Sequence, residues 1–124
     1  MPAPVIVVHD EMETRELAVS ALRAAGFQAA GFDDPMKALP VVEADTRVRV
    51  LVTRVDFGPG KLNGAALARM LRYKRQSLRA VFVALPENRV HAESEGEFVP
   101  MPLDAHILIE TVARLLTEQG GRNG

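Results

Sequence analysis

Short apolar runs alternate along the chain with longer segments whose apolar residues recur at a helical period. The run at residues 5–8 is apolar at every position, which is typical of a strand buried on both faces of a parallel sheet. Runs at 48–52 and 81–85 predict two more strands, and weaker runs at 27–32 and 98–99 bring the number of predicted strands to five.

A first helix is predicted over residues 11–25. Its apolar stripe includes Met12 and Leu17, and Gly26 follows as a stop signal.

The next helix begins with a capping residue, Asp33 or Asp34, followed by Pro35. We expect Pro40 to kink or break this helix, because proline lacks the N–H group that an interior helical position needs.

Two further helices are predicted in the second half of the chain. One covers 65–73, with Met70 on its buried side, and Asp104 caps the other. The polar, glycine-rich residues 119–124 are expected to fray.

Strands that alternate with helices predict a parallel sheet with right-handed crossovers. Ligands of such sheets bind at the carboxyl ends of the strands, where the strand order reverses. The residues expected at these ends are His9, Arg54, Ala84 and Met101.

Composition narrows the class of protein. With 124 residues, 48% of them apolar, the chain fits a single domain, 1–124, with one core. The net charge of −1 gives no general attraction to nucleic acid or membranes, and the absence of cysteine excludes disulfides and thiolate chemistry. No signal peptide or membrane span is recognisable, so a cytoplasmic location is expected.

The order and spacing of four segments resemble the receiver domains of bacterial two-component response regulators over nearly the full length of the chain. These are 7–11 after the first strand, 51–55 at the third, Gly64 at a helix start, and Met101-Pro102 after the fifth. The resemblance implies a CheY-like, flavodoxin-like, doubly wound α/β fold of five parallel strands, order 2-1-3-4-5, with flanking helices. It also implies a cis bond at Met101-Pro102.

Members of this family hold Mg²⁺ with two acidic residues after the first strand and phosphorylate an Asp that ends the third. A Ser or Thr after the fourth strand and a Lys after the fifth contact the phosphoryl group. Carboxylates suit Mg²⁺, and a positioned cation offsets the incoming charge.

This sequence departs from that pattern at four positions. The acidic pair falls on His9-Asp10, with Glu11 beside it, and the acceptor position falls on Arg54. Arg cannot accept a phosphoryl group, and its fixed charge opposes Mg²⁺. The hydroxyl position falls on Ala84 and the lysine position on Met101. We therefore expect no metal, no cofactor and no catalytic residue, with Arg54 paired internally to Asp10.

Asp56 is the alternative acceptor, since its separation from Gly64 also suits the family's loop. Arg54 is preferred because the apolar run stops at Val52 and Leu51-Val52-Thr53 aligns directly. If Asp56 were the acceptor, Asp10 would help to hold Mg²⁺.

The interval between Ala84 and Met101 is shorter than in typical receivers, and residues 86–97 are polar. The fourth helix is therefore expected to be reduced or absent. Phe98 falls where many receivers carry a switching aromatic residue, and core packing explains it equally well.

The resulting hypothesis is a stand-alone pseudo-receiver, not an enzyme, that acts by protein contact in a phosphorelay. Candidate partners are a histidine kinase, another receiver or a second copy of the chain. The alternative is an active receiver phosphorylated on Asp56 by a histidine kinase with Mg²⁺. The basic residues at 69–79 are interpreted as a solvated helix end rather than a nucleic-acid site.

Overall fold

The computed structural model describes residues 4–123, and the side chains of residues 4–118. A single parallel sheet contains all five predicted strands in the predicted order, β2-β1-β3-β4-β5. The strands are β1 Val5–Val8, β2 Ala29–Phe32, β3 Val50–Thr53, β4 Arg79–Ala84 and β5 Glu97–Pro100.

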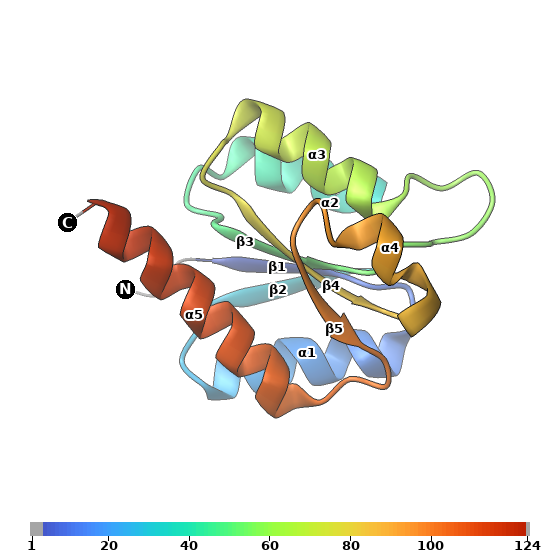
Figure 1. The fold of residues 1–124 in the computed structure, drawn as a ribbon, viewed down its shortest axis with the longest axis horizontal. Coiled ribbons are helices and arrows are strands. Elements are labelled where there is room, and N and C mark those ends of the chain that lie inside the picture. Colours follow the sequence, from blue (N-terminus) through green and yellow to red (C-terminus); the bar gives the residue numbers. More distant parts are fainter. Residues whose placement is uncertain (1–3, 124) are drawn as a thin grey trace.

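Helices cover both faces of the sheet (Figure 1). One face carries α1 and α5, and the other carries α2, α3 and α4 (Figure 1). The helices are α1 Met12–Ala24, α2 Pro35–Ala44, α3 Gly64–Lys74, α4 Arg89–Ala92 and α5 Ala105–Asn123, and a 3₁₀ turn at Pro86–Asn88 precedes α4.

This layering explains why β1 is apolar at every position. Val5 and Val7 belong to the core beneath α1 and α5, whereas Ile6 and Val8 belong to the core beneath α2, α3 and α4. Side chains of a strand alternate between the two faces, so a sheet covered on both sides needs apolar residues throughout. Each fully buried aliphatic side chain contributes about 1.5–3 kcal/mol relative to exposure.

Helix starts follow recognisable capping signals. The Asp34 carboxylate accepts a hydrogen bond from the Met36 N–H at 2.8 Å, so Asp34 is the cap that precedes Pro35. Asn63, which the sequence analysis did not single out, caps α3 by accepting from the Ala65 N–H at 2.7 Å. These bonds satisfy N–H groups that have no partner within the helix.

Of the two predicted effects of Pro40, a kink or a break, the break is wrong, because α2 continues through Pro40 to Ala44. The missing N–H would have donated to the carbonyl of Met36, which lies in the exposed first turn of the helix. Solvent can replace the lost partner there, so the proline is tolerated.

The apolar stripes were placed too broadly. Met12, Leu17 and Met70 are all exposed, and within α1 only Ala18 and Leu22, which the predicted stripe also included, are buried. The last helix was also predicted too short, since α5 includes most of the tail and ends at Asn123. Gly124 lies outside the described residues.

The fourth helix is reduced, as predicted. It consists of the 3₁₀ turn and a four-residue helix, and Ala92 is its only buried residue. The Arg89 guanidinium lies over the ring of Phe98, 5.3 Å from its centroid. Phe98 packs against the core on the α2, α3 and α4 face of the sheet, so core packing is one role it has in this fold.

Candidate functional site

The carboxyl ends of β1, β3, β4 and β5 bring the predicted site residues to one edge of the sheet. Val8 pairs with Thr53, and the Arg54 N–H donates to the Val8 carbonyl at 3.0 Å. On the other side, the Met101 N–H donates to the Ala84 carbonyl at 2.8 Å. Main-chain hydrogen bonds therefore fix where the residue after each strand lies.

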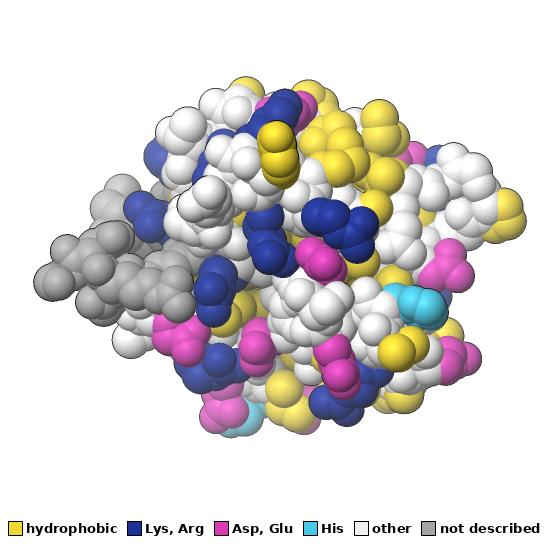
Figure 2. Space-filling model, turned by 45° about the horizontal axis from the view of Figure 1, so that its top comes forward, with side chains coloured by type: hydrophobic (Ala, Val, Ile, Leu, Met, Phe, Trp, Pro, Cys, Tyr) yellow, Lys and Arg dark blue, Asp and Glu magenta, His cyan; other side chains and the backbone are white. Residues whose placement is uncertain are grey.

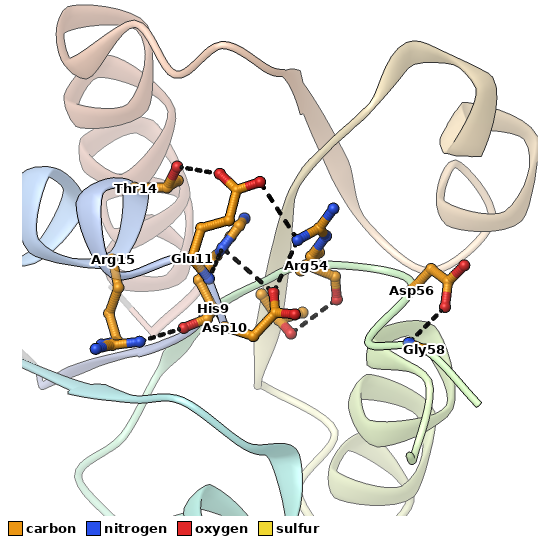
Figure 3. Close-up of polar contacts among 9 residues, drawn as sticks. His9, Asp10, Glu11, Thr14, Arg15, Arg54, Asp56 and Gly58 are labelled. Atoms are coloured by element: carbon orange, nitrogen blue, oxygen red, sulfur yellow. Dashed lines mark hydrogen bonds and ion pairs between the residues drawn. The ribbon is translucent and has the colours of Figure 1, made fainter. Parts of the chain in front are cut away.

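Arg54 binds the acidic residues of the loop after β1 (Figure 3). One guanidinium nitrogen, Nη1, lies 2.8 Å from Asp10 Oδ1 and 3.6 Å from Glu11 Oε2. The Arg54 side chain is 17% exposed, whereas those of Asp10 and Glu11 are 42% and 48% exposed. The predicted contact between Arg54 and Asp10 is thus confirmed, with the cation more deeply placed than its counter-ions.

A close approach between β3 and α3 fixes the position of Arg54. A Cβ atom on Gly64 would lie 1.7 Å from the Arg54 carbonyl oxygen and 3.0 Å from Thr53 Oγ1. The Gly64 N–H donates to the Val55 carbonyl at 2.7 Å. Only glycine allows the start of α3 to approach the end of β3 so closely.

Asp56 lies away from the pocket that His9, Asp10, Glu11 and Arg54 form (Figure 3). It is exposed, and its Oδ1 accepts a hydrogen bond from the Gly58 N–H at 2.8 Å, within the loop that leads to α3. In this structure Asp56 therefore supports a turn, whereas Arg54 is the first residue after β3.

His9 is buried, with only 2% of its surface exposed. Its Nδ1 accepts a hydrogen bond from the Glu11 N–H at 3.2 Å, so the neutral ring carries its proton on Nε2. Burial lowers the pKa of His9, and the charge of Arg54 lowers it further, against weaker opposing effects of Asp10 and Glu11.

Two buried donors of the pocket lack a hydrogen-bond partner among the described residues: His9 Nε2 and Arg54 Nε. The backbone of Val83 lies near the His9 ring and slightly raises its pKa, but His9 Nε2 makes no hydrogen bond of normal geometry. Arg54 is thus bound to Asp10 through Nη1, whereas its Nε and the Nε2 of His9 have no hydrogen-bond partner among the described residues.

Two residues that the sequence analysis missed hold the acidic loop in place. Arg15 Nη1 donates to the His9 carbonyl at 2.8 Å, and Thr14 Oγ1 donates to Glu11 Oε1 at 2.9 Å (Figure 3). The sequence carries no signal for the first contact, because a single Arg on an amphipathic helix usually faces solvent.

Ala84 and Met101 place apolar groups at the carboxyl ends of β4 and β5. Ala84 is fully buried, and Met101 packs against the core beneath α1 and α5. The Met101-Pro102 bond is cis, as predicted. Neither side chain can donate a hydrogen bond to an anion.

A polar cavity of about 250 Å³ lies beside the pocket and includes Asp10 in its wall. The Lys61 ammonium lies 2.7 Å from Asp34, and that of Lys37 lies 2.9 Å from Asp33. Lys61 lowers the pKa of the Asp34 carboxyl group. The charges that line this cavity are therefore already neutralised in pairs.

Across the described residues, no three His, Cys, Asp or Glu side chains are grouped so that they could hold a metal ion together. The same part of the chain contains no helix of sufficient length and apolar character to traverse a bilayer.

No protein-family profile matches the sequence, and no curated protein matches it. Solved structures do match. A response regulator receiver domain protein from Clostridium thermocellum superposes with a TM-score of 0.84 at 17% identity, covering 95% of this chain and 97% of the other. A CheY-like receiver protein from Methanospirillum hungatei gives a TM-score of 0.85 at 16% identity, covering 98% and 99%.

NtrX from Brucella abortus gives a TM-score of 0.88 at 23% identity over 99% of this chain, which spans 29% of the NtrX chain. The chain therefore has the fold of CheY-like receiver domains, in agreement with the resemblance found in the sequence.

Proposed function

We propose that this protein is a receiver-like module of two-component signalling that acts by protein contact and takes up no phosphoryl group. The observation that carries the proposal is the 2.8 Å contact between Arg54 and Asp10. The residue after β3 presents a fixed cation to the acidic loop, where an active receiver presents a carboxylate to Mg²⁺.

The charges of the pocket argue against Mg²⁺. This ion needs several oxygen ligands in octahedral geometry, supplied by carboxylates, carbonyls and water. Here the nearest carboxylate, Asp10, is already paired with Arg54, and the guanidinium would repel a divalent cation. The residues present at this edge therefore do not fit the metal that the family uses.

The groups that would hold a phosphoryl group are replaced as well. Arg54 has no nucleophilic oxygen, Ala84 offers no hydroxyl, and Met101 offers no ammonium group. Without phosphorylation to change its conformation, the module would bind its partner through surfaces that are always exposed. Fold analogy supports a histidine kinase or another receiver as the partner.

The second candidate function is an active receiver with Asp56 as acceptor. One observation favours it: the Asp56 side chain is exposed and therefore accessible to a phosphoryl donor. The same carboxylate is held by the Gly58 N–H, and the pocket residues lie elsewhere (Figure 3).

Titration with Mg²⁺ and beryllofluoride, followed by amide NMR, separates the two candidates. We expect no saturable shifts at Asp10, Arg54 or Asp56. Incubation with acetyl phosphate and Mg²⁺ should likewise add no phosphoryl mass, while an active receiver treated in parallel gains one. Saturable shifts that disappear in Asp56→Asn would overturn the proposal in favour of the active receiver.

The Arg54→Asp variant is the matched positive control. It removes the internal cation and adds a third carboxylate beside Asp10 and Glu11, so we expect saturable Mg²⁺ shifts around these residues that the original protein lacks. If both proteins respond equally to Mg²⁺, Arg54 does not exclude the metal.

A further inference from the structure

The outward face of α3 combines an exposed aromatic residue with basic side chains. The helix packs on the sheet through Leu67 and Leu71, whereas Arg69, Met70, Tyr73 and Lys74 point outward. Tyr73 is the only tyrosine of the chain and is 90% exposed. The fold therefore gains almost nothing from its ring.

This composition is typical of the centre of a protein interface. Tyr, Met and Arg are enriched in interfaces, and Tyr buries a large area while few torsions become fixed. Figure 2 shows hydrophobic and basic side chains side by side on the face that carries α3. Met70 and Tyr73 lie one turn apart on this face, so one partner side chain could contact both.

The charges on this face are unevenly matched. The helix contains Arg69, Arg72 and Lys74 and no acidic residue. Arg69 and Arg72 share a single carboxylate, Glu95, at 3.5 and 3.2 Å. Two guanidinium groups on one carboxylate leave a net positive charge, which is available to an acidic partner.

A polar cavity of about 240 Å³ adjoins the last turn of α3. Its wall includes Arg72, Gln76 and Arg79, the carboxylates of Glu95 and Glu97, and an apolar lining that includes Leu78 and Leu115. Because the two glutamates offset the two arginines, the cavity adds no net positive charge to that of the outward face of α3.

We propose that the outward face of α3, formed by Arg69, Met70, Tyr73 and Lys74, docks an acidic amphipathic helix of a partner protein, with Tyr73 as its anchor. This inference rests on the proposed function in assuming that the module works by protein contact, and it adds the place and the chemistry of the partner. Surface ion pairs such as Lys74 with Glu43 are weak, so the partner's carboxylates can exchange for them.

The arrangement favours a protein over a nucleic acid. The exposed Met70 side chain on this face offers an apolar contact that a phosphate backbone cannot use. Arg75 is turned inward, where it donates to the carbonyls of Val42 and Asp45. Not all of the basic side chains between residues 69 and 79 are therefore available to a partner in solvent.

The test uses a synthetic amphipathic peptide of Glu, Leu and Ala, with its glutamates on one side, titrated into the 124-residue protein and followed by amide NMR. We expect saturable shifts centred on Arg69 to Lys74. Tyr73→Ala should weaken binding roughly tenfold or more, as for an interface anchor, and Lys74→Glu should also weaken it.

Met12→Ala is the matched control, since Met12 is also an exposed apolar residue but lies on α1, on the other face of the sheet. Met12→Ala should leave the affinity for the peptide unchanged. An amide spectrum of Tyr73→Ala that otherwise matches that of the original protein confirms that this variant is folded. No saturation at millimolar peptide, shifts centred on another element, or undiminished binding by Tyr73→Ala overturns the proposal. Stronger binding of a single-stranded oligonucleotide to the same residues also overturns it.

The beryllofluoride titration of the same sample reports on the opposite end of α3, where Gly64 meets Arg54. A failure of peptide binding is thus distinguishable from a failure of the proposed function.

Discussion

Arg54 is more buried than the carboxylates it binds, so the loss of a counter-ion should be felt mainly by the cation. Asp10→Ala removes the 2.8 Å partner and leaves Glu11 at 3.6 Å. We expect a loss of about 1 kcal/mol in the free energy of unfolding, reduced from a fully buried pair because Asp10 is 42% exposed.

Urea denaturation measures this effect, and Glu16→Ala on the exposed side of α1 is the control, with an expected change below about 0.5 kcal/mol. Equal stability of Asp10→Ala and the original protein would show that Arg54 needs no counter-ion from this loop.

His9 should make stability depend on pH. Its pKa lies below the ordinary value of 6.5 in the folded protein because the ring is buried and faces Arg54, although Asp10 and Glu11 oppose the shift. The unfolded chain then binds the proton more readily than the folded protein. The stabilising contribution of the neutral ring is complete above about pH 6.5 and is lost as the pH falls toward the folded pKa.

The expected slope in that window is at most about 1.4 kcal/mol per pH unit. Denaturation of the original protein and of His9→Gln at several pH values gives this slope by difference, because the exposed His91 and His106 are common to both. The titration of the His9 ring by NMR gives the midpoint directly. A midpoint above 6.5 contradicts the burial argument.

Among the elements, the junction of β3 and α3 is the most sensitive to a single added carbon. In Gly64→Ala the new Cβ would lie 1.7 Å from the Arg54 carbonyl, so backbone must move. We expect a loss of about 3 kcal/mol or more in the free energy of unfolding. The pocket should be disturbed too, since Arg54 lies directly at the contact.

Gly60→Ala separates this clash from simple backbone strain. Gly60 has a positive φ of 77° but no atom near its missing Cβ. Its cost should therefore be about 1–2 kcal/mol, with no change in the amide spectrum around Arg54. Thermal or urea unfolding compares the two variants, and a larger loss for Gly60→Ala than for Gly64→Ala would refute the steric argument.

The elements that the sequence predicted well are those defined by local patterns. The continuous apolar run of β1 and the cap at Asp34 each follow from a few adjacent residues. The pairing of Arg54 with Asp10 was also predictable, because strand order alone brings both to one edge of the sheet.

Side-chain contacts between segments that are far apart in the sequence were not predictable. Lys61 reaches Asp34 across the gap between two loops, and Arg75 reaches carbonyls at the end of α2. Neither contact leaves a periodic signal in the sequence. The burial of Met70 was predicted wrongly because Leu67, Ala68 and Leu71 already form the side of α3 that faces the sheet.

In the molecule as a whole, the reduced fourth helix stands out as an element with little buried structure. Among its residues and those of the preceding 3₁₀ turn, only Ala92 is buried, whereas β3 is buried throughout. We expect the amides of 87–92 to exchange by local opening, at a free energy well below that of global unfolding, and those of β3 to exchange near the global value.

Native-state hydrogen exchange measures the difference, and the amides of Leu67 and Leu71 in α3 serve as a helical reference with buried side chains. Protection of the 87–92 amides equal to that of β3 would show that the short helix opens only when the whole molecule unfolds.

Because the guanidinium of Arg54 lies beside Asp10, the counter-ion of this carboxylate comes from the chain itself and not from solution. A counter-ion that is part of the chain has no free concentration, and its effective concentration at the carboxylate is fixed by the fold. A diffusible ion fills its site only in proportion to how much of it the surroundings hold. The occupancy of this pocket by positive charge is therefore the same in an ion-rich and an ion-depleted medium, and it is altered by mutation or unfolding rather than by dilution.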